Sequence, residues 1–133
     1  MPRAIRHDPF PVQDPYHGIY AHGVETKPGG RTLYVSGQIG LSPEGDLAQD
    51  FKGQCHQALS NVESILTAAH MSLADIVKMS FFLVRRQDMA DLVAVRKERL
   101  DGVRPAITTV FVSSLVDERW LVEVEVIASA DSE

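Results

Sequence analysis

The sequence contains a single cysteine, Cys55, among its 133 residues. One cysteine cannot form an internal disulfide, which excludes the disulfide-rich class of small secreted domains and is typical of a reducing compartment. The sequence also lacks any apolar run near the roughly 20 residues that a membrane-spanning helix needs. Its first residues show no apolar stretch of the kind that secretory signals carry. We therefore expect a soluble, cytoplasmic protein with no membrane partner.

Basic residues are scarce as well. Lys and Arg total 13 against 18 Asp and Glu, which gives a formal net charge of −5. A protein that binds nucleic acid usually needs a basic patch to neutralise phosphates. The adjacent basic pairs in this chain are Arg85-Arg86 and Arg96-Lys97, and we interpret them as solvated surface charges. The composition thus predicts no nucleic-acid partner.

The common cofactor and metal motifs are missing too. Gly37-Gln38-Ile39-Gly40 lacks the full dinucleotide-binding spacing and is followed by a turn instead of a helix. The five histidines show no metal-ligand spacing. No Gly-x-Ser-x-Gly frame surrounds Ser36, which disfavours a hydrolase nucleophile there. The sequence therefore predicts no metal and no organic cofactor.

The residues that are present have the composition of one ordinary globular domain. Hydrophobic residues make up 44% of the chain and charged residues 23%, and a chain of this length can bury a core without metal or disulfide support. Four prolines fall in residues 1–15. Because proline lacks the N–H that a β ladder uses, we expect an extended N-terminal arm over 1–15 and a single domain over 16–133.

Hydrophobic periodicity predicts the order hairpin, helix, strand, helix, strand, strand. A turn at Lys27-Pro28-Gly29-Gly30 predicts that the first two strands form the hairpin. The clearest helix is expected over Asp46–Ala69, where apolar residues recur at helical spacing. The other expected elements are strands Gly18–Thr26, Arg31–Ile39, Ile76–Val84, Ala106–Ser113 and Trp120–Ser129, a helical turn at Ser72–Asp75, and a helix over Met89–Leu100 capped by Asp88.

These elements predict an α+β fold in which two helices pack on one face of a mixed sheet. The other face would then be open to water. By alternation along the strands, we expect it to carry Glu123, Glu125, Leu121, Ile127, Ile107 and Phe111. Burying apolar surface is worth about 25 cal/mol per Å², so self-association through this face is the expected outcome.

Two carboxylates, Glu123 and Glu125, fall on one face of the last predicted strand. Solvated or salt-bridged glutamates are the ordinary explanation for such a pair. A carboxylate positioned in an interface cleft is the alternative. The residues alone leave both explanations open.

Several segments, in their order and spacing, match the pattern of one known family. The matching segments are Asp14-Pro15-Tyr16, Leu33–Ile39, Gln57–Val62, Asp75–Lys78, Arg104-Pro105-Ala106 and Val122–Ala128. Together they resemble the Rid family of reactive intermediate deaminases, also called YjgF-like and formerly named endoribonuclease L-PSP. The resemblance runs from about Asp14 to Ala130.

The resemblance implies a chorismate-mutase-like fold and a homotrimer with small-molecule clefts between subunits. Archetypal members hydrolyse 2-imino acids and their enamine tautomers to 2-keto acids and ammonia, without a metal or an organic cofactor. Carried onto this chain, the family pattern assigns Glu123 to positioning the attacking water. It assigns Tyr16, Ser36, Gly37 and the residues at positions 107 and 109 to the substrate pocket.

The chain departs from the family at the residue that binds the substrate carboxylate. The family reads Pro-Ala-Arg, whereas this chain reads Pro105-Ala106-Ile107, with Thr109 two places on. Losing a charge-assisted hydrogen bond costs roughly 1.5–3 kcal/mol. We therefore expect weak or no turnover of simple 2-imino acids and a neutral or more apolar ligand group at Ile107. Arg104, if it reaches back into the cleft, is the alternative source of positive charge.

Three functions follow as hypotheses. The first is a divergent imine or enamine hydrolase, and the second is a non-catalytic trimer that binds a metabolite and has a regulatory role. The third, RNA cleavage, is suggested only by the older family name and is disfavoured by the acidic charge balance.

Overall fold

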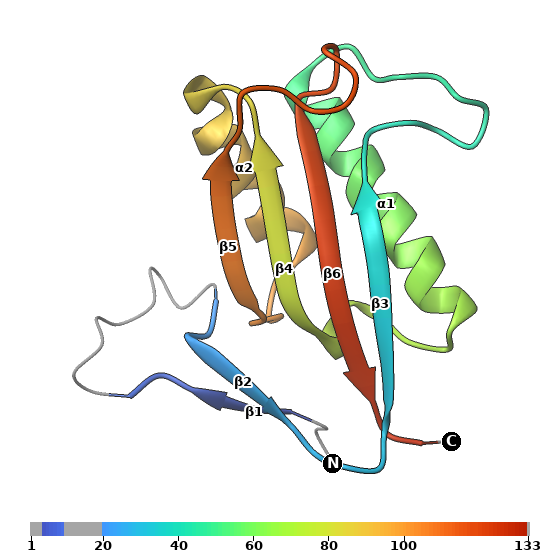
Figure 1. Cartoon of the computed structure of the whole chain (residues 1–133), viewed down its shortest axis with the longest axis vertical. Coiled ribbons are helices and arrows are strands. Elements are labelled where there is room, and N and C mark those ends of the chain that lie inside the picture. The colour runs from blue at the N-terminus through green and yellow to red at the C-terminus, as the bar shows by residue number, and fades with distance from the viewer. Residues whose placement is uncertain (1–3, 10–19, 133) are drawn as a thin grey trace.

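A four-stranded mixed sheet backed by two helices forms the main body of the protein, and a two-stranded ribbon lies at one end of it (Figure 1). The computed structural model of the chain describes residues 4–9 and 20–132. The ribbon consists of β1 (Ala4–His7) and β2 (Gly23–Thr26). The sheet and helices are β3 (Arg31–Gln38), α1 (Phe51–Ala68), β4 (Ile76–Leu83), α2 (Met89–Arg99), β5 (Ala106–Phe111) and β6 (Val122–Ala130), with single 3-10 turns η2 (Leu73–Asp75) and η3 (Arg86–Asp88) before β4 and α2.

The strand order in the main sheet is β3-β6-β4-β5. β4 and β5 are parallel and are joined through α2, whereas β6 is antiparallel to both of its neighbours. Both helices lie behind the sheet in Figure 1, and no described helix covers the front. This arrangement confirms the predicted α+β fold with a mixed sheet and two helices on one face.

The core lies between the back of the sheet and the two helices. Along β6, buried residues alternate with Glu123, which is half-buried, and Glu125, which is exposed. The buried set is Val122, Val124, Val126 and Ala128, each at most 1% exposed. Fully burying a Val or Leu side chain contributes about 1.5–3 kcal/mol, so this period-2 pattern fixes which face of β6 points inward.

No helix within residues 4–9 and 20–132 is long and apolar enough to cross a membrane.

The first helix begins later than predicted. The periodic pattern suggested a start at Asp46, but α1 starts at Phe51 because Asp50 caps it. The Asp50 Oδ1 atom accepts a hydrogen bond of 2.8 Å from the backbone N–H of Gly53. This contact satisfies one of the free donors at the helix start. Residues 46–49 instead belong to the loop that leads from β3 to the helix.

Asp88 stands at the N-cap position of α2, as predicted, but its side chain does not cap the helix. Instead, both of its carboxylate oxygens accept hydrogen bonds of 2.8 Å from Arg85. Two charge-assisted bonds to one guanidinium bind the carboxylate more strongly than a single capping bond would, and they hold the turn between β4 and α2.

The predicted hairpin between the first two strands is also wrong. The turn forms, with Gly29 at a φ of +83°, but β2 pairs with β1 and not with β3. Residues of the expected N-terminal arm thus supply β1, which satisfies the hydrogen-bonding groups of β2. The ribbon is joined to the start of β5 through a 2.9 Å bond from Ala21 N to Pro105 O, a long-range contact that local patterns do not reveal.

Candidate functional site

The Glu123 side chain lies directly against the backbone of Gly37. A Cβ atom built on Gly37 would stand 2.6 Å from Cδ of Glu123 and closer still to Oε2. The two residues meet because β3 bulges here: Val35 lies opposite Val126, and Gln38 lies opposite Val124, so one extra residue is inserted in β3. Bulges re-aim side chains and often occur next to functional sites.

Ser36 lies in the same bulge and is exposed on the front of the sheet. It borders a shallow depression of about 340 Å³ between β3 and β6. Tyr34 and Ile127, which are opposite each other in the ladder, also border it. Phe82 of β4 is the register partner of Glu123, so the two residues are cross-strand neighbours on this face. The structure therefore brings Glu123, Gly37 and Ser36 together at one end of the front face.

Ile107 and Thr109 lie on the back of the sheet, which corrects the prediction that Ile107 shares a face with Glu123. Ile107 is opposite Met79 and Thr109 is opposite Phe81. Met79 and Phe81 are fully buried beneath the helices, and residues paired across a ladder face the same side. Ile107 accordingly packs against the core cluster. The register between β4 and β5 sets this orientation, and single-strand alternation cannot show it.

Two further residues expected on the front lie elsewhere. Phe111 is opposite the buried Leu83, and the guanidinium of Arg86 lies 5.0 Å from the centre of its ring. Leu121 packs against the core cluster. Ile127 does lie on the front, opposite the 76% exposed Tyr34. The uncovered face is therefore more polar than predicted, and Tyr34, at 76% exposed, is a large hydrophobic side chain that it presents to solvent.

A single chain does not assemble all the predicted site residues. Glu123 is on β6 and Ile107 is on β5, with β4 between them, and the two face opposite sides. Tyr16 lies outside the described residues. β5 and β3 are the two edge strands of the sheet. The start of β5 is bridged by Ala21 at Ala106, and no described strand pairs with the rest of its outer edge.

Arg104 is held by the N-terminal ribbon. Its Nη2 donates a hydrogen bond of 2.7 Å to Asp8 Oδ2 and one of 3.0 Å to the carbonyl oxygen of Tyr20. The pKa of Asp8 lies below its usual value because it accepts from the backbone N–H of His22 and from Arg104. Arg104 is thus neutralised by a carboxylate of its own chain and is not a free cation beside Ile107.

Arg96 on α2 is a buried cation that has no anionic partner within residues 4–9 and 20–132, and sequence reasoning missed it. It is 8% exposed, and its guanidinium carbon lies 5.6 Å from the centre of the Phe81 ring. No acceptor among the described residues bonds to its Nε. Burial lowers the pKa of its guanidinium. The interpretation of Arg96 as a solvated surface charge is therefore wrong.

The signal for Arg96 was present in the helical periodicity. It follows Leu92 by four residues and adjoins Val95, and both are buried on the inner side of α2. The energetic balance at this position is unfavourable. A desolvated cation–π contact contributes about 2 kcal/mol, whereas burying an ion costs several kcal/mol unless it is paired.

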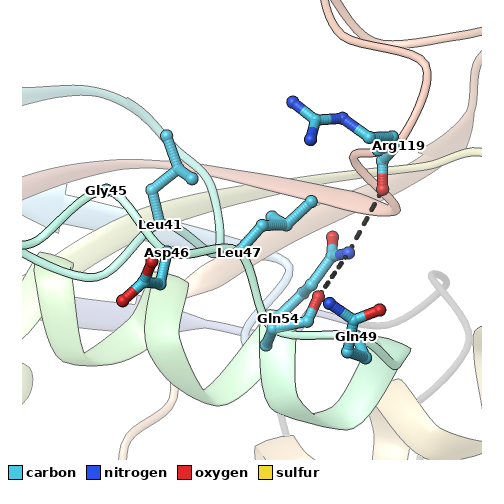
Figure 2. A pocket seen from close by; sticks show the side chains of 8 residues that line it. Leu41, Gly45, Asp46, Leu47, Gln49, Gln54 and Arg119 are labelled. Atoms are coloured by element: carbon cyan, nitrogen blue, oxygen red, sulfur yellow. Dashed lines mark hydrogen bonds between the residues drawn. The ribbon is translucent and has the colours of Figure 1, made fainter.

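A cavity of about 610 Å³ lies where the β3–α1 loop meets the segment before β6 (Figure 2). Asp46 and Arg119 border it from opposite sides. Arg119 already pairs with Asp117 at 2.7 Å. Gln54 at the base is 1% exposed and donates to the carbonyl oxygens of Ala48 and Arg119 at 3.1 and 3.2 Å. The polar groups at its base are satisfied internally, and no predicted site residue borders the cavity.

Cys55 and the histidines contribute no site chemistry in the described part of the chain. Cys55 is completely buried on α1, and burial raises the pKa of its thiol to about 12. It therefore behaves as a small apolar residue. Across residues 4–9 and 20–132, no group of three His, Cys, Asp or Glu side chains is arranged to hold a metal ion.

Comparison with known proteins gives consistent matches over most of the chain. The family model described as endoribonuclease L-PSP matches residues 13–130. A RutC family protein from Pyrococcus horikoshii is 34% identical over 113 residues, which are 84% of this chain and 86% of that protein. Escherichia coli TdcF, whose name presents it as a candidate reactive intermediate deaminase, is 35% identical over 85 residues, 63% of this chain and 64% of TdcF.

Solved structures agree with these sequence matches. The YyfB protein of Yersinia pestis, described as a member of the conserved Rid protein family, has a TM-score of 0.85 at 27% identity. It covers 96% of this chain and 99% of its own. The crystal structure of Escherichia coli TdcF with bound serine has a TM-score of 0.72 at 31% identity and covers 84% of this chain and 88% of its own.

Proposed function

The chain belongs to the Rid family, and on that premise we propose that it is a divergent imine or enamine hydrolase with clefts between the subunits of a homotrimer. Its relative TdcF is named as a candidate reactive intermediate deaminase. The proposed reaction uses water and needs no metal or organic cofactor. We do not propose RNA cleavage, because a net charge of −5 disfavours binding to a phosphate backbone.

The cleft would form where the front of one subunit meets the edge of the next. Glu123, Gly37 and Ser36 would come from one subunit. Ile107 and Thr109, on edge strand β5, would come from its neighbour, since one chain cannot bring both groups together. The uncovered front face supports this arrangement, because Tyr34 and Ile127 would be removed from water in the assembly.

The proposed chemistry is addition of water to a C=N bond. The Glu123 carboxylate accepts a hydrogen bond from water and takes its proton as oxygen attacks the imine carbon. Glu123 passes this proton to the nitrogen, which gives the carbinolamine and restores the carboxylate. A second proton from solvent makes the amine a leaving group, the C–N bond breaks, and a ketone and ammonia leave as the hydroxyl proton returns to solvent. Positioning of this kind can raise the reaction rate by several orders of magnitude, and imines already hydrolyse readily in water.

The substrate preference follows from position 107. An isoleucine cannot form the bidentate contacts that arginine makes with a carboxylate. Arg104, the adjacent candidate, is paired with Asp8 at 2.7 Å. We therefore propose that turnover of simple 2-imino acids is weak or absent and that the group seated at Ile107 is neutral or apolar.

The observation that carries this proposal is the placement of the Glu123 carboxylate against Gly37 at the bulge of β3. A half-buried carboxylate that is held over a glycine, beside an exposed serine, can hold a water molecule in a cleft. Without that contact, Glu123 would be an ordinary surface carboxylate.

The test measures acceleration of ammonia and ketone release from a panel of enzymatically generated imines that ranges from small to bulky and from acidic to neutral. We expect turnover of at least one bulkier imine and little of 2-iminopropanoate. Glu123→Gln keeps the shape of the side chain and removes the proton acceptor, so the rate should fall about 10²- to 10⁴-fold.

Glu118→Gln is the matched control, because Glu118 is an exposed carboxylate just before β6 and its loss should leave the rate unchanged. Rates indistinguishable from the protein-free background across the whole panel would contradict the enzymatic proposal.

A second function remains favoured by a specific observation, the combination of Ile107 with the pairing of Arg104 to Asp8. A cleft without a free cation on β5 fits a non-catalytic trimer that binds a metabolite and has a regulatory role. Ligand-dependent shifts in melting temperature without turnover would support this alternative, and no shift with any compound of a broad metabolite set would contradict it.

A further inference from the structure

We propose that Arg96 is an anion-binding residue, which holds a carboxylate carried by the substrate at the back of strands β4 and β5. This inference rests on the proposed function, since it names a substrate class for the same cleft. The class is an imine or enamine whose carboxylate sits on an arm long enough to pass Ile107.

The first argument is that Arg96 has no hydrogen-bond acceptor among the residues that the structure describes. The residue is 8% exposed, and its Nε bonds to no acceptor in the described part of the chain. Its identified neighbour is the face of the Phe81 ring, at 5.6 Å from the guanidinium carbon. An aromatic face attracts a cation, but unlike a carboxylate it offers no oxygen to accept hydrogen bonds from the five N–H groups of the guanidinium.

The second argument is the contrast with Arg99, one turn further along α2. Arg99 donates to the carbonyl oxygen of His56 at 3.0 Å, to Ser60 Oγ at 3.1 Å and to Glu63 Oε1 at 2.9 Å. The guanidinium of Arg99, which joins α2 to α1, therefore has hydrogen-bond acceptors from its own chain. The unsatisfied guanidinium of Arg96 is not the general condition of this helix.

The third argument is position. Phe81, beneath the guanidinium, is the register partner of Thr109, two residues from Ile107 on the same face of β5. Arg96 thus lies over β4, one strand inward from β5, and neighbouring strands are about 4.8 Å apart. A short 2-imino acid that stops at Ile107 would fall short of this cation, whereas a longer acidic substrate would reach it.

The experiment uses glutarate as a five-carbon dicarboxylate probe and glutaramide as its neutral counterpart, with binding measured by calorimetry and by melting temperature. Wild-type protein should bind glutarate and raise its melting temperature, and glutaramide should have no effect. Arg96→Met should weaken glutarate binding about 10- to 100-fold, because charge-assisted hydrogen bonds are lost. Arg86→Met, which removes the exposed cation over Phe111, should bind glutarate as the wild type does.

Arg96→Met should fold at least as stably as the wild type, since it removes an unpaired buried charge. If it fails to fold, Arg96→Lys keeps the charge without the planar fork and should still lose affinity. Unchanged glutarate affinity in the variant that folds, or no glutarate binding by the wild type, would overturn the proposal. Glu123→Gln should bind glutarate normally, so a failure of imine hydrolysis with intact, Arg96-dependent binding would count against the proposed function alone.

Discussion

At the scale of single residues, close approach explains why position 37 is a glycine. Its backbone φ is not in the left-handed region, in contrast to Gly29, Gly45 and Gly102. The side chain of Glu123 instead fills the space where a Cβ would stand. The smallest residue at the bulge and the proposed water-positioning carboxylate therefore depend on each other.

Gly37→Ala should displace the Glu123 carboxylate without disrupting the fold, because the atoms that must move are the end of a flexible side chain. We expect a melting temperature close to the wild type and a loss of imine hydrolysis of about 10²-fold or more. Gly23→Ala is the control, because a Cβ there would meet His7 Cβ at an ordinary 3.8 Å. Wild-type hydrolysis by Gly37→Ala would contradict the proposed role of Glu123.

At the scale of the elements, Gln54 joins α1 to two loops. Its Oε1 accepts from Leu121 N at 2.8 Å, and its Nε2 donates to the carbonyl oxygens of Ala48 and Arg119 at 3.1 and 3.2 Å. It is 1% exposed. A buried amide that closes three contacts fixes the loop before α1 to the segment that enters β6, and it thereby helps to place the start of the strand that carries Glu123.

Gln54→Leu keeps the approximate volume of the side chain but leaves backbone groups unpaired. We expect the free energy of unfolding to fall by about 1–3 kcal/mol or more in denaturant titrations. Gln57→Leu provides the comparison, because the Gln57 side chain bonds within the same helix to Asn61 at 2.9 Å, and it should change stability by less than about 0.5 kcal/mol. Equal losses in the two variants would contradict the bridging role of Gln54.

The N-terminal ribbon shows how distant contacts override a local turn signal. Pro28 and Gly29 form the predicted turn, yet β2 leaves the main sheet and pairs with β1. Arg6 Nε donates a hydrogen bond of 2.9 Å to the carbonyl oxygen of Arg104, and the Arg104 side chain in turn binds Asp8. These contacts join residues almost one hundred positions apart and neutralise the arginine that adjoins Ile107.

At the scale of the whole molecule, one face of the sheet has no helix over it. In the single chain, Tyr34 is 76% exposed and Val110 is 39% exposed. Phe82 and Ile127 are partly buried on the same side. Covering apolar surface of this kind contributes about 25 cal/mol per Å², so we expect copies of the chain to associate through this face.

Light scattering after size exclusion should show three copies of the 14.7 kDa chain. Tyr34→Glu places a charge on the uncovered face and should shift the protein toward monomers while leaving each chain folded. Val116→Glu changes a 93% exposed residue of a loop and should leave the assembly intact. A monodisperse 14.7 kDa wild-type particle would remove the basis for clefts between subunits.

Local patterns in the sequence determined the element types, the buried side of β6 and the membership in the Rid family, because each depends on residues near one another along the chain. The alternation of Val122 to Ala128 is one example, and the motif around Ser36 and Gly37 is another. The departure at Ile107 was equally visible, since it is a single substitution within a known pattern.

Only the tertiary structure decided which residues meet. The register of β5 against β4 turned Ile107 and Thr109 toward the helices, the ribbon paired Arg104 with Asp8, and the packing of α2 buried Arg96 over Phe81. Each of these outcomes depends on contacts between segments that are distant in sequence. The helical period already places Arg96 on the inner side of α2. The strand register, the Arg104–Asp8 pair and the Phe81 ring beneath Arg96 come from packing and pairing between segments.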